Sequence, residues 1–410
     1  MNVRNIVFSA VLCLFLCGPI VLFCSEKTAG LQLPAWATAE EAKYLEGESK
    51  FLDMSRVLSV EAFEDGAFQS ALEDEVGCHI PLKAHALLGC ARVQHGAICF
   101  SNLLFDWSCT PFFYGSSIVL TREGDRLLET PEYATSEILE ECSLVSKAYD
   151  SFAVRHPDVD VYLYLCPDSQ NVMGGPVAQL VSDPMNYDTL RRVVLGETSS
   201  CIWVDGEVPY DGFCEWWFLS DHHWTINGAY DAYRRITRAM DIEHPVEKGD
   251  AIFYKQPKFY GSLARRALSK SVVDKIEDYC FDLPSFEIAI DGEEKMYEDL
   301  VHIDLYSNQR WKESVFSSRY AEYFHADHAI IRIDNRELPS GGSLLIVGDS
   351  YTNCFERLLA THYATTYVLD PRHLDATVDE FMKEHPEIED VLFLMRATNF
   401  FSERTCNFLM

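Results

Sequence analysis

The chain has 410 residues, of which 64 are Asp or Glu and 34 are Lys or Arg, so that its formal net charge is −30. This balance argues against a general binder of nucleic acid or of anionic membranes, because neutralising phosphates requires clustered Lys and Arg. It also makes a strongly anionic polymer an unfavourable substrate. Because the acidic residues are spread along the chain, their simplest role is solubility.

The chain begins with a nearly uninterrupted apolar run, Ile6–Cys24, which is about as long as a helix needs to be to cross a bilayer. Arg4 precedes the run, which favours an anchor with its amino terminus inside and the body exported. A cleaved signal peptide stays open, since Gly18-Pro19 would break a long apolar helix. We therefore assign residues 1–30 to a signal anchor or signal peptide. The predicted location is the cell membrane, with a single pass and an extracytoplasmic domain, or the exterior if the segment is cleaved.

Cysteine usage fits an exported body without a structural metal. Three of the 14 cysteines lie in the apolar run, which leaves 11 for the body, an odd number. Some of these can form disulfides, but at least one must stay free or pair between chains. No CxxC pair and no Cys/His spacing typical of a zinc site occurs, so we expect neither a metal nor a cofactor.

Apolar periodicity predicts an α/β unit with a parallel, largely buried sheet covered by helices. In chain order it predicts a helix over 136–156, a strand over 159–166, a strand over 344–347, a helix over 353–362, a strand over 366–369, a helix over 377–385 capped from Asp375, and a strand over 391–395. Residues 246–330 break this alternation and are rich in aromatic and charged side chains. We therefore divide the body into a first part at 31–245, an inserted smaller subdomain at 246–330 and a second part at 331–410. The aromatic residues of the insert are interpreted as core packing or as part of a substrate groove.

Two motifs carry chemistry. Asp221-His222-His223-Trp224 precedes a predicted helix whose cap is Thr225, and in an extended stretch Asp221 and His223 would share one side while His222 points away. The motif can also be interpreted as a helix cap beside buried histidines, or as two ligands of a metal site.

Gly348-Asp349-Ser350 follows the strand predicted at 344–347, where a glycine permits the sharp turn into a helix. A serine at the carboxyl end of a strand stands where ligands bind in open α/β sheets. Its hydroxyl needs a base to become a nucleophile, and the base needs an orienting group, which His223 and Asp221 can supply. A plain turn is the alternative for this tripeptide.

These motifs, with Phe259-Tyr260-Gly261-Ser262-Leu263 and the segment from Leu358 to Arg372, resemble the DHHW-type proteins of the SGNH hydrolase superfamily, which are related to the alginate O-acetyltransferases of the AlgJ and AlgX type. The resemblance covers roughly residues 155–402. It implies an SGNH-like parallel sheet in a branch with permuted motif order, because the Asp-x-His pair comes before the serine.

The resemblance also implies roles for particular residues. Ser350 would be the nucleophile, His223 the general base and Asp221 its orienting acid. The oxyanion-hole glycine and asparagine of the superfamily have no clear counterparts. Asn399 is a candidate oxyanion or substrate-binding residue, although a turn or C-cap role is favoured for it, and the backbone N–H of Ser350 or Tyr351 is the preferred donor.

The function expected from the resemblance is that of an extracytoplasmic serine O-acyltransferase. It would acetylate a cell-surface or exported polysaccharide, with a membrane-bound acyltransferase as the partner that supplies acyl groups. A carbohydrate esterase or deacetylase uses the same machinery with water as the acceptor. A non-catalytic glycan-binding assembly protein is the alternative from another class.

Overall fold

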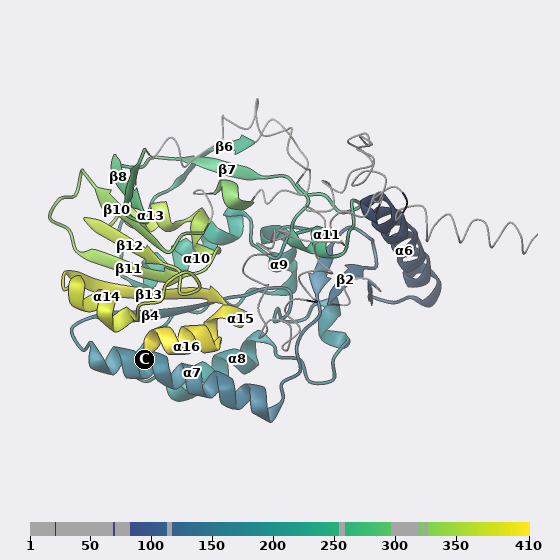
Figure 1. The fold of residues 1–410 in the computed structure, drawn as a ribbon, viewed down its shortest axis with the longest axis horizontal. Helices are drawn as coiled ribbons and strands as arrows, with labels where there is room; N and C mark the ends of the chain where they lie inside the picture. Colours follow the sequence, from purple (N-terminus) through teal and green to yellow (C-terminus); the bar gives the residue numbers. More distant parts are fainter. Residues whose placement is uncertain are drawn as a thin grey trace, which may run out of the picture.

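The computed structural model describes residues 83–112, 117–253, 259–296, 320–323 and 327–410, together with Val21 and Gln69 (Figure 1). The apolar run predicted as an anchor lies outside these residues, apart from Val21. Within the described ranges, no helix combines the length and the apolar character needed to cross a membrane. Every cysteine in the same ranges is a free thiol.

An eight-stranded sheet forms the centre of the molecule, in the order β5-β4-β13-β11-β12-β10-β8-β9. Neighbouring strands run parallel from β5 to β12, whereas β10, β8 and β9 join the edge beside β12 in antiparallel pairs. The prediction of a parallel sheet is therefore right for five strands, and the antiparallel edge was not predicted. The strands are β4 (Asp160–Cys166), β5 (Ile202–Trp203), β8 (Phe286–Ile290), β9 (Glu293–Lys295), β10 (Ile330–Asn335), β11 (Ser343–Gly348), β12 (Thr365–Leu369) and β13 (Ile388–Arg396).

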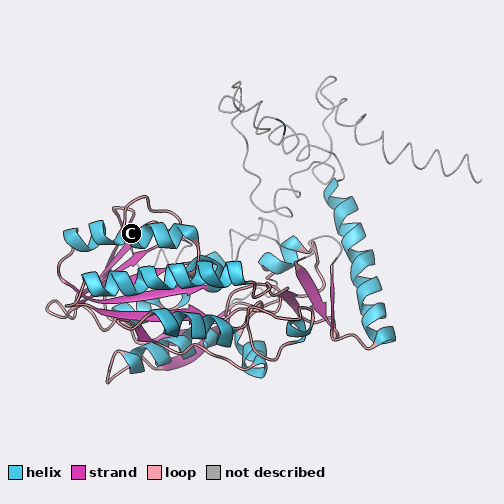
Figure 2. Cartoon of the chain, turned by 90° about the horizontal axis from the view of Figure 1, so that it is seen from below, coloured by secondary structure: helices cyan, strands magenta, loops and turns pink. Residues whose placement is uncertain are grey.

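Helices cover both faces of this sheet, as Figures 1 and 2 show. Side chains alternate across a strand, so Leu344 and Ile346 of β11 pack with one core cluster and Leu345 and Val347 with another. The first cluster includes residues of α10 (Ile226–Ala239) and α13 (Glu356–Ala360). The second includes residues of α7 (Ser136–Arg155), α8 (Tyr187–Glu197), α14 (Val378–Glu384) and α16 (Glu403–Leu409), with Phe400 of α15 (Ala397–Phe400). Burial on both faces explains why the central strands are continuous apolar runs.

Local signals placed most of these elements correctly, with two corrections. The helix predicted over 377–385 is capped by Thr377, whose side chain forms a capping box with Glu380, and not by Asp375. The helix predicted over 353–362 is broken into a 3₁₀ turn, Thr352–Cys354, and the short α13. Its apolar residues are buried all the same, because tertiary packing holds them where helical hydrogen bonding is incomplete.

A smaller unit precedes the main sheet. It contains α6 (Lys83–Phe105) and a three-stranded antiparallel sheet of β1 (Cys109–Pro111), β2 (Ile118–Thr121) and β3 (Leu127–Glu129). Its apolar core also takes Leu263 and Ala264 of α11 (Ser262–Arg266). The small core therefore anchors α11, which reaches the site described below.

Three further elements lie outside the main sheet. The helix α9 (Tyr210–Trp216) packs on the main core just before the Asp-His-His-Trp segment. Residues 246–330, predicted as an insert, contain β6 (Lys248–Phe253) and β7 (Glu277–Phe281), which form a separate two-stranded sheet. The same range also contributes β8 and β9 to the main sheet.

Candidate active site

Ser350 stands just beyond the carboxyl end of β11, half-buried. The turn before it is tight. A Cβ on Gly348 would lie 2.2 Å from the Cγ2 of Thr352 and 2.8 Å from the carbonyl oxygen of Leu394, so only glycine fits there. The strand-to-turn junction therefore presents the serine hydroxyl at the edge where parallel α/β sheets bind ligands.

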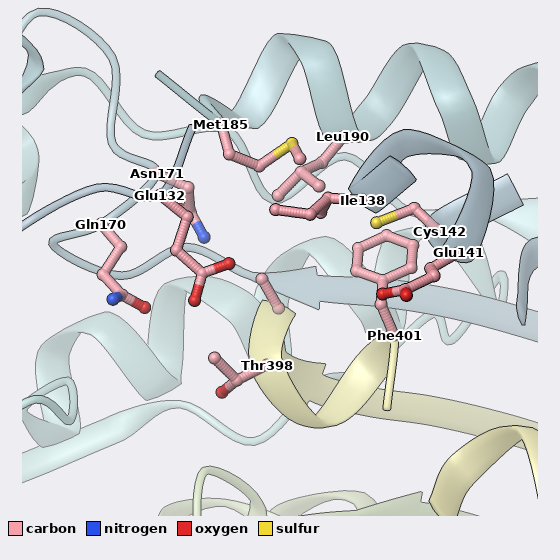
Figure 3. Close-up of a pocket in the computed structure, with 11 residues that line it drawn as sticks. Glu132, Ile138, Glu141, Cys142, Gln170, Asn171, Met185, Leu190, Thr398 and Phe401 are labelled. Atoms are coloured by element: carbon pink, nitrogen blue, oxygen red, sulfur yellow. The ribbon is translucent and has the colours of Figure 1, made fainter. Parts of the chain in front are cut away.

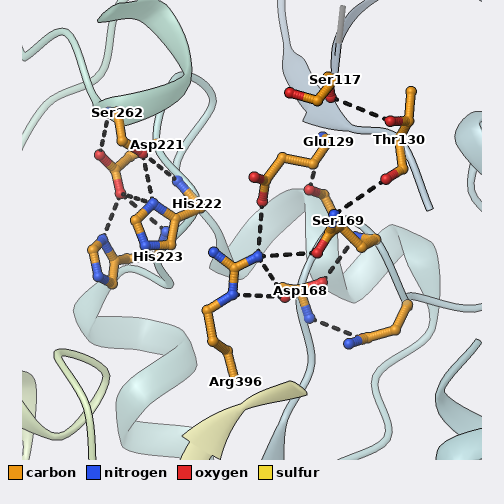
Figure 4. A network of polar contacts seen from close by, with 12 residues as sticks. Ser117, Glu129, Thr130, Asp168, Ser169, Asp221, His222, His223, Ser262 and Arg396 are labelled. Atoms are coloured by element: carbon orange, nitrogen blue, oxygen red, sulfur yellow. Dashed lines mark hydrogen bonds and ion pairs between the residues drawn. The ribbon is translucent and has the colours of Figure 1, made fainter. Parts of the chain in front are cut away.

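Asp221 and His223 converge through a local turn rather than through strand alternation. The Asp221 carboxylate accepts a hydrogen bond from the backbone N–H of His223 at 3.0 Å, which is an Asx turn. His222 was predicted to point away, and this is wrong. Its ring lies 3.8 Å from the His223 ring between centroids, and its Nδ1 is 2.6 Å from the Oγ of Ser262 (Figure 4). The bend brings consecutive side chains together, which an extended strand would separate.

Three side chains form one hydrogen-bonded line. The Nδ1 of His223 is 2.6 Å from the Oδ1 of Asp221, and its Nε2 is 2.7 Å from the Oγ of Ser350. Because a carboxylate only accepts, Nδ1 carries the proton and Nε2 is left to accept the serine proton. This is the geometry that the sequence predicts for a nucleophile, a base and an orienting acid, and it joins two residues, His223 and Ser350, that lie 127 positions apart in the chain.

The charges of Asp221 and His223 favour transfer of a proton from Ser350 to His223. Burial alone would raise the pKa of Asp221, but the charge of His223 and the hydrogen bonds from His223 and Ser262 outweigh it and hold the pKa well below its usual value. Asp221 therefore stays ionised and stabilises an imidazolium on His223. Burial and the neighbouring His223 charge lower the pKa of His222 well below its usual value, so this second ring is neutral.

A second layer of contacts fixes Asp221. Its Oδ2 accepts the backbone N–H of Ser262 at 2.6 Å, where α11 begins. The preceding residue, Ser220, is held by Asp274, whose Oδ2 accepts the Ser220 N–H at 2.6 Å and the Ser220 hydroxyl at 2.5 Å. Burial raises the pKa of Asp274 to about 6. No sequence signal indicates Asp274, because its contact with Ser220 spans 54 residues and belongs to no motif.

Tyr320 covers the imidazole of His223. Its ring is stacked on that of His223 with a centroid distance of 3.7 Å and an interplanar angle of 4°, and its side chain is buried. A positive charge on His223 would face the electron-rich surface of this ring. Tyr320 belongs to the aromatic-rich segment, for which core packing and a substrate groove were both considered. The structure places this member directly against the base.

Asp349 ties the nucleophile turn to the next strand. Its carboxylate accepts the backbone N–H of Tyr351 at 3.1 Å, the backbone N–H of Arg396 at 3.2 Å and the Nδ2 of Asn399 at 2.7 Å. Burial raises the pKa of Asp349 above its usual value. The side chain of Asn399, a candidate oxyanion residue, is therefore occupied in holding Asp349.

The backbone donors at the turn differ in availability. The Tyr351 N–H is used by Asp349, whereas the Ser350 N–H has no hydrogen-bond partner among the described residues. The Ser350 N–H is thus the better candidate oxyanion donor of the two. The Tyr351 hydroxyl donates to the backbone oxygen of His222 at 2.5 Å, and its own carbonyl accepts the indole N–H of Trp224 at 3.1 Å. These two bonds tie the serine turn to the histidine segment.

A buried ion network lies beside these residues (Figure 4). The Arg396 guanidinium at the end of β13 pairs with Asp168 and with Glu129, each at 3.0 Å. Glu129 also pairs with Arg266 of α11. The network joins the ends of β3 and β13 to α11. Both β13 and α11 lie next to the candidate triad, because β13 pairs with β11 and the Ser262 N–H at the start of α11 donates to Asp221.

The hydrogen bonds also bear on the metal alternative. Asp221, His222 and His223 offer ligand atoms within 4.8 Å of one another. However, both ring nitrogens of His223 are engaged, one by Asp221 and one by Ser350, and His222 uses its Nδ1 on Ser262. The donor set therefore fits a proton-transfer line better than a set of metal ligands.

By sequence, no family model and no curated protein matches the chain. By structure, it is similar to a DHHW family protein from Eubacterium siraeum, with 17% identity and a TM-score of 0.55 over 71% of this chain and 94% of that one. It is also similar to Bacillus cereus PatB1 with a sulfonyl adduct, with 17% identity and a TM-score of 0.54 over 70% and 96%. The O-acetyltransferase domain of Pseudomonas putida AlgJ aligns more distantly, with 11% identity and a TM-score of 0.40 over 70% and 93%. The chain therefore shares the α/β fold of the DHHW family protein and of PatB1, and the resemblance drawn from its motifs is confirmed at the level of the fold.

Proposed function

We propose that the protein is an extracytoplasmic serine O-acyltransferase that acetylates a hydroxyl group of a cell-surface or exported polysaccharide. The single observation that carries the proposal is the continuous line from Asp221 through His223 to Ser350, with contacts of 2.6 and 2.7 Å. Such a line activates a serine that is otherwise a poor nucleophile at neutral pH. The shared fold with the DHHW family protein supports it.

The reaction follows from the positions of the three groups. As the Oγ of Ser350 attacks the acyl carbon of the donor, the Nε2 of His223 takes the hydroxyl proton, and Asp221 stabilises the imidazolium. The tetrahedral oxyanion is placed to accept a hydrogen bond from the Ser350 N–H. Collapse expels the donor's leaving group, which takes the proton from His223, and leaves an acyl ester on Ser350. A sugar hydroxyl then gives its proton to the Nε2 of His223 and attacks the ester carbon. The bond between that carbon and the Oγ of Ser350 breaks, the Oγ takes the proton back from His223, and the acylated sugar departs.

The choice of acceptor separates a transferase from an esterase, because water completes the cycle with the same machinery. The extracytoplasmic location is part of the proposal and is supported by the apolar run at residues 6–24. The acyl donor is proposed to come from a membrane-bound acyltransferase, as the motif resemblance implies.

The test follows the fate of an acetyl group from an activated ester. The purified protein is incubated with the ester alone and with the ester plus oligosaccharides, and free acetate and acetylated sugar are quantified. The proposal predicts acetylated sugar that depends on Ser350 and His223, with little acetate when acceptor is present. Acetate release at one rate with or without every acceptor would identify an esterase.

A further inference from the structure

A cavity of about 210 Å³ is lined by residues of α7, α8, α15 and the loop after β4 (Figure 3). At roughly 30 Å³ per water, this volume corresponds to about seven water molecules, enough for a substituent of several heavy atoms. One side is apolar, and acidic and amide side chains surround the remainder. The lining includes Ile138, Met185, Leu190 and Phe401 on the apolar side and Glu132, Glu141, Gln170 and Asn171 on the polar side.

Asn171 contributes a buried hydrogen-bond donor to the cavity. Its side chain is buried, with 2% of the residue exposed, and its Oδ1 accepts the backbone N–H of Asp168 at 3.0 Å. Its Nδ2 has no hydrogen-bond partner among the described residues, and Figure 3 shows this nitrogen directed into the cavity beside the Glu132 carboxylate. Leaving a buried donor unsatisfied is unfavourable. The site therefore favours a ligand that brings a hydrogen-bond acceptor to this nitrogen.

The cavity is connected to the candidate triad through α15. Gln170, in the lining, accepts from the Nη2 of Arg396 at 3.2 Å. The next two residues, Ala397 and Thr398, line the cavity, and Asn399 of the same helix turn holds Asp349 behind the nucleophile. These contacts connect the lining of the cavity with the turn that carries Ser350.

We propose that this cavity binds the acylamino group of a sugar unit in the acceptor glycan. The carbonyl oxygen of the group accepts from the Nδ2 of Asn171, its N–H donates to Glu132, and its methyl group packs against Met185 and Leu190. Assigning the ligand to the acceptor rests on the proposed function, whereas binding of the group to the cavity does not.

Two other ligand classes satisfy fewer of these features. A protonated amino sugar would be attracted to Glu132 and Glu141, but an ammonium group offers no acceptor to Asn171. An unsubstituted hydroxyl supplies an acceptor but leaves the apolar side unfilled. Only a group with an acceptor, a donor and a methyl uses the whole lining.

The experiment measures binding in a background without turnover. Calorimetric titration of the full-length Ser350→Ala protein uses three trisaccharides of β-1,4-linked sugars: N-acetylglucosamine, its de-N-acetylated form and glucose. The N-acetylated sugar is expected to bind at least about tenfold more tightly than either other sugar, as one satisfied buried hydrogen bond and one buried methyl imply.

Three variants test whether the preference for the N-acetylated sugar comes from the cavity. Asn171→Asp keeps the acceptor for Asp168 but removes the donor, and it should abolish the preference. Thr398→Phe, at an exposed position of the lining, should block the cavity without endangering the fold. Glu137→Gln alters an exposed acid of α7 outside the lining and should leave binding unchanged.

Equal affinity for the three sugars, tighter binding of the de-N-acetylated sugar, or a preference that survives both Asn171→Asp and Thr398→Phe would overturn the inference. These outcomes differ from failure of the proposed function. If the wild-type protein forms no acyl-serine yet prefers the N-acetylated sugar, the cavity assignment stands and the catalytic proposal falls.

Discussion

Gly261 gives the sharpest test of how the candidate acid is positioned. A Cβ built on this glycine would lie 2.3 Å from the Cβ of Asp221 and 2.5 Å from its Oδ2. Non-bonded carbon atoms rest at about 3.5–4.0 Å, so Gly261→Ala requires a displacement of roughly 1 Å between the two segments. The backbone at Gly261 has φ of −75°, which alanine adopts freely. Any effect of Gly261→Ala therefore comes from the steric clash with Asp221 and not from backbone strain.

The expected loss of reactivity follows from the two hydrogen bonds that the Asp221 carboxylate accepts. Its Oδ1 orients His223 and its Oδ2 accepts the Ser262 N–H, so a shift disturbs both ends of the carboxylate. A displacement of 1 Å in a catalytic constellation lowers the rate by about a hundredfold. Overpacking in a fitted site destabilises by about 1–3 kcal/mol, which is compatible with a folded protein.

The assay is the rate at which a serine-directed fluorophosphonate labels the protein, with the free energy of unfolding measured in parallel. Gly196→Ala is the matched control, because nothing lies within 4 Å of that Cβ and the position is in α8. The control should gain about 0.5–1 kcal/mol of stability and label normally. A folded Gly261→Ala protein that labels at the wild-type rate would refute the argument that Asp221 must occupy its present position.

Three further predictions concern the groups behind the triad. Because burial raises the pKa of Asp274 from 3.8 to about 6, its folded form binds a proton more tightly than its unfolded form, and this contribution to stability falls by on the order of 3 kcal/mol as pH rises through that window. When the free energy of unfolding is measured from pH 3 to 8, wild type should lose about this much stability relative to Asp274→Asn, and parallel curves for the two proteins would contradict the prediction. Tyr320→Leu should lower kcat/KM about tenfold through loss of the ring facing the imidazolium, and Tyr320→Phe should restore it in ester-hydrolysis assays; equal losses in both would show that the stacked ring is not the cause. Asn399→Leu removes one of the three hydrogen bonds to the buried Asp349 carboxylate and should cost about 1–3 kcal/mol in chemical denaturation, whereas an unchanged midpoint would show that the contact is unimportant.

The sequence was sufficient where a local signal determines the outcome. Leu344–Val347 is apolar on both sides and is bounded by glycines, which specifies a buried strand followed by a turn, and the structure has β11 there. Thr225 caps α10 as predicted, because capping depends only on the residues of the first turn. The candidate triad was found for a related reason. Its three residues lie in two short motifs, each of which is recognisable by itself.

Contacts between segments that are distant in the sequence could not be predicted. Nothing near Tyr320 in the sequence indicates that its ring would stack on His223, and nothing near Asp274 indicates that it would hold Ser220. The antiparallel edge was missed because β8 lies inside a segment interpreted as an insert, although Phe286–Ile290 is rich in residues that favour strands. The predicted orientation of His222 is wrong because the prediction treats the turn at residues 221–223 as an extended strand.

The most direct measurement is mass spectrometry of the protein after brief exposure to an activated acetyl ester or to a sulfonyl fluoride, the latter chosen because PatB1 carries a sulfonyl adduct. The account predicts one modification, on the peptide containing Ser350, absent in Ser350→Ala and strongly reduced in His223→Ala. A folded protein that is modified at another residue, or that is modified at Ser350 equally well without His223, would contradict it.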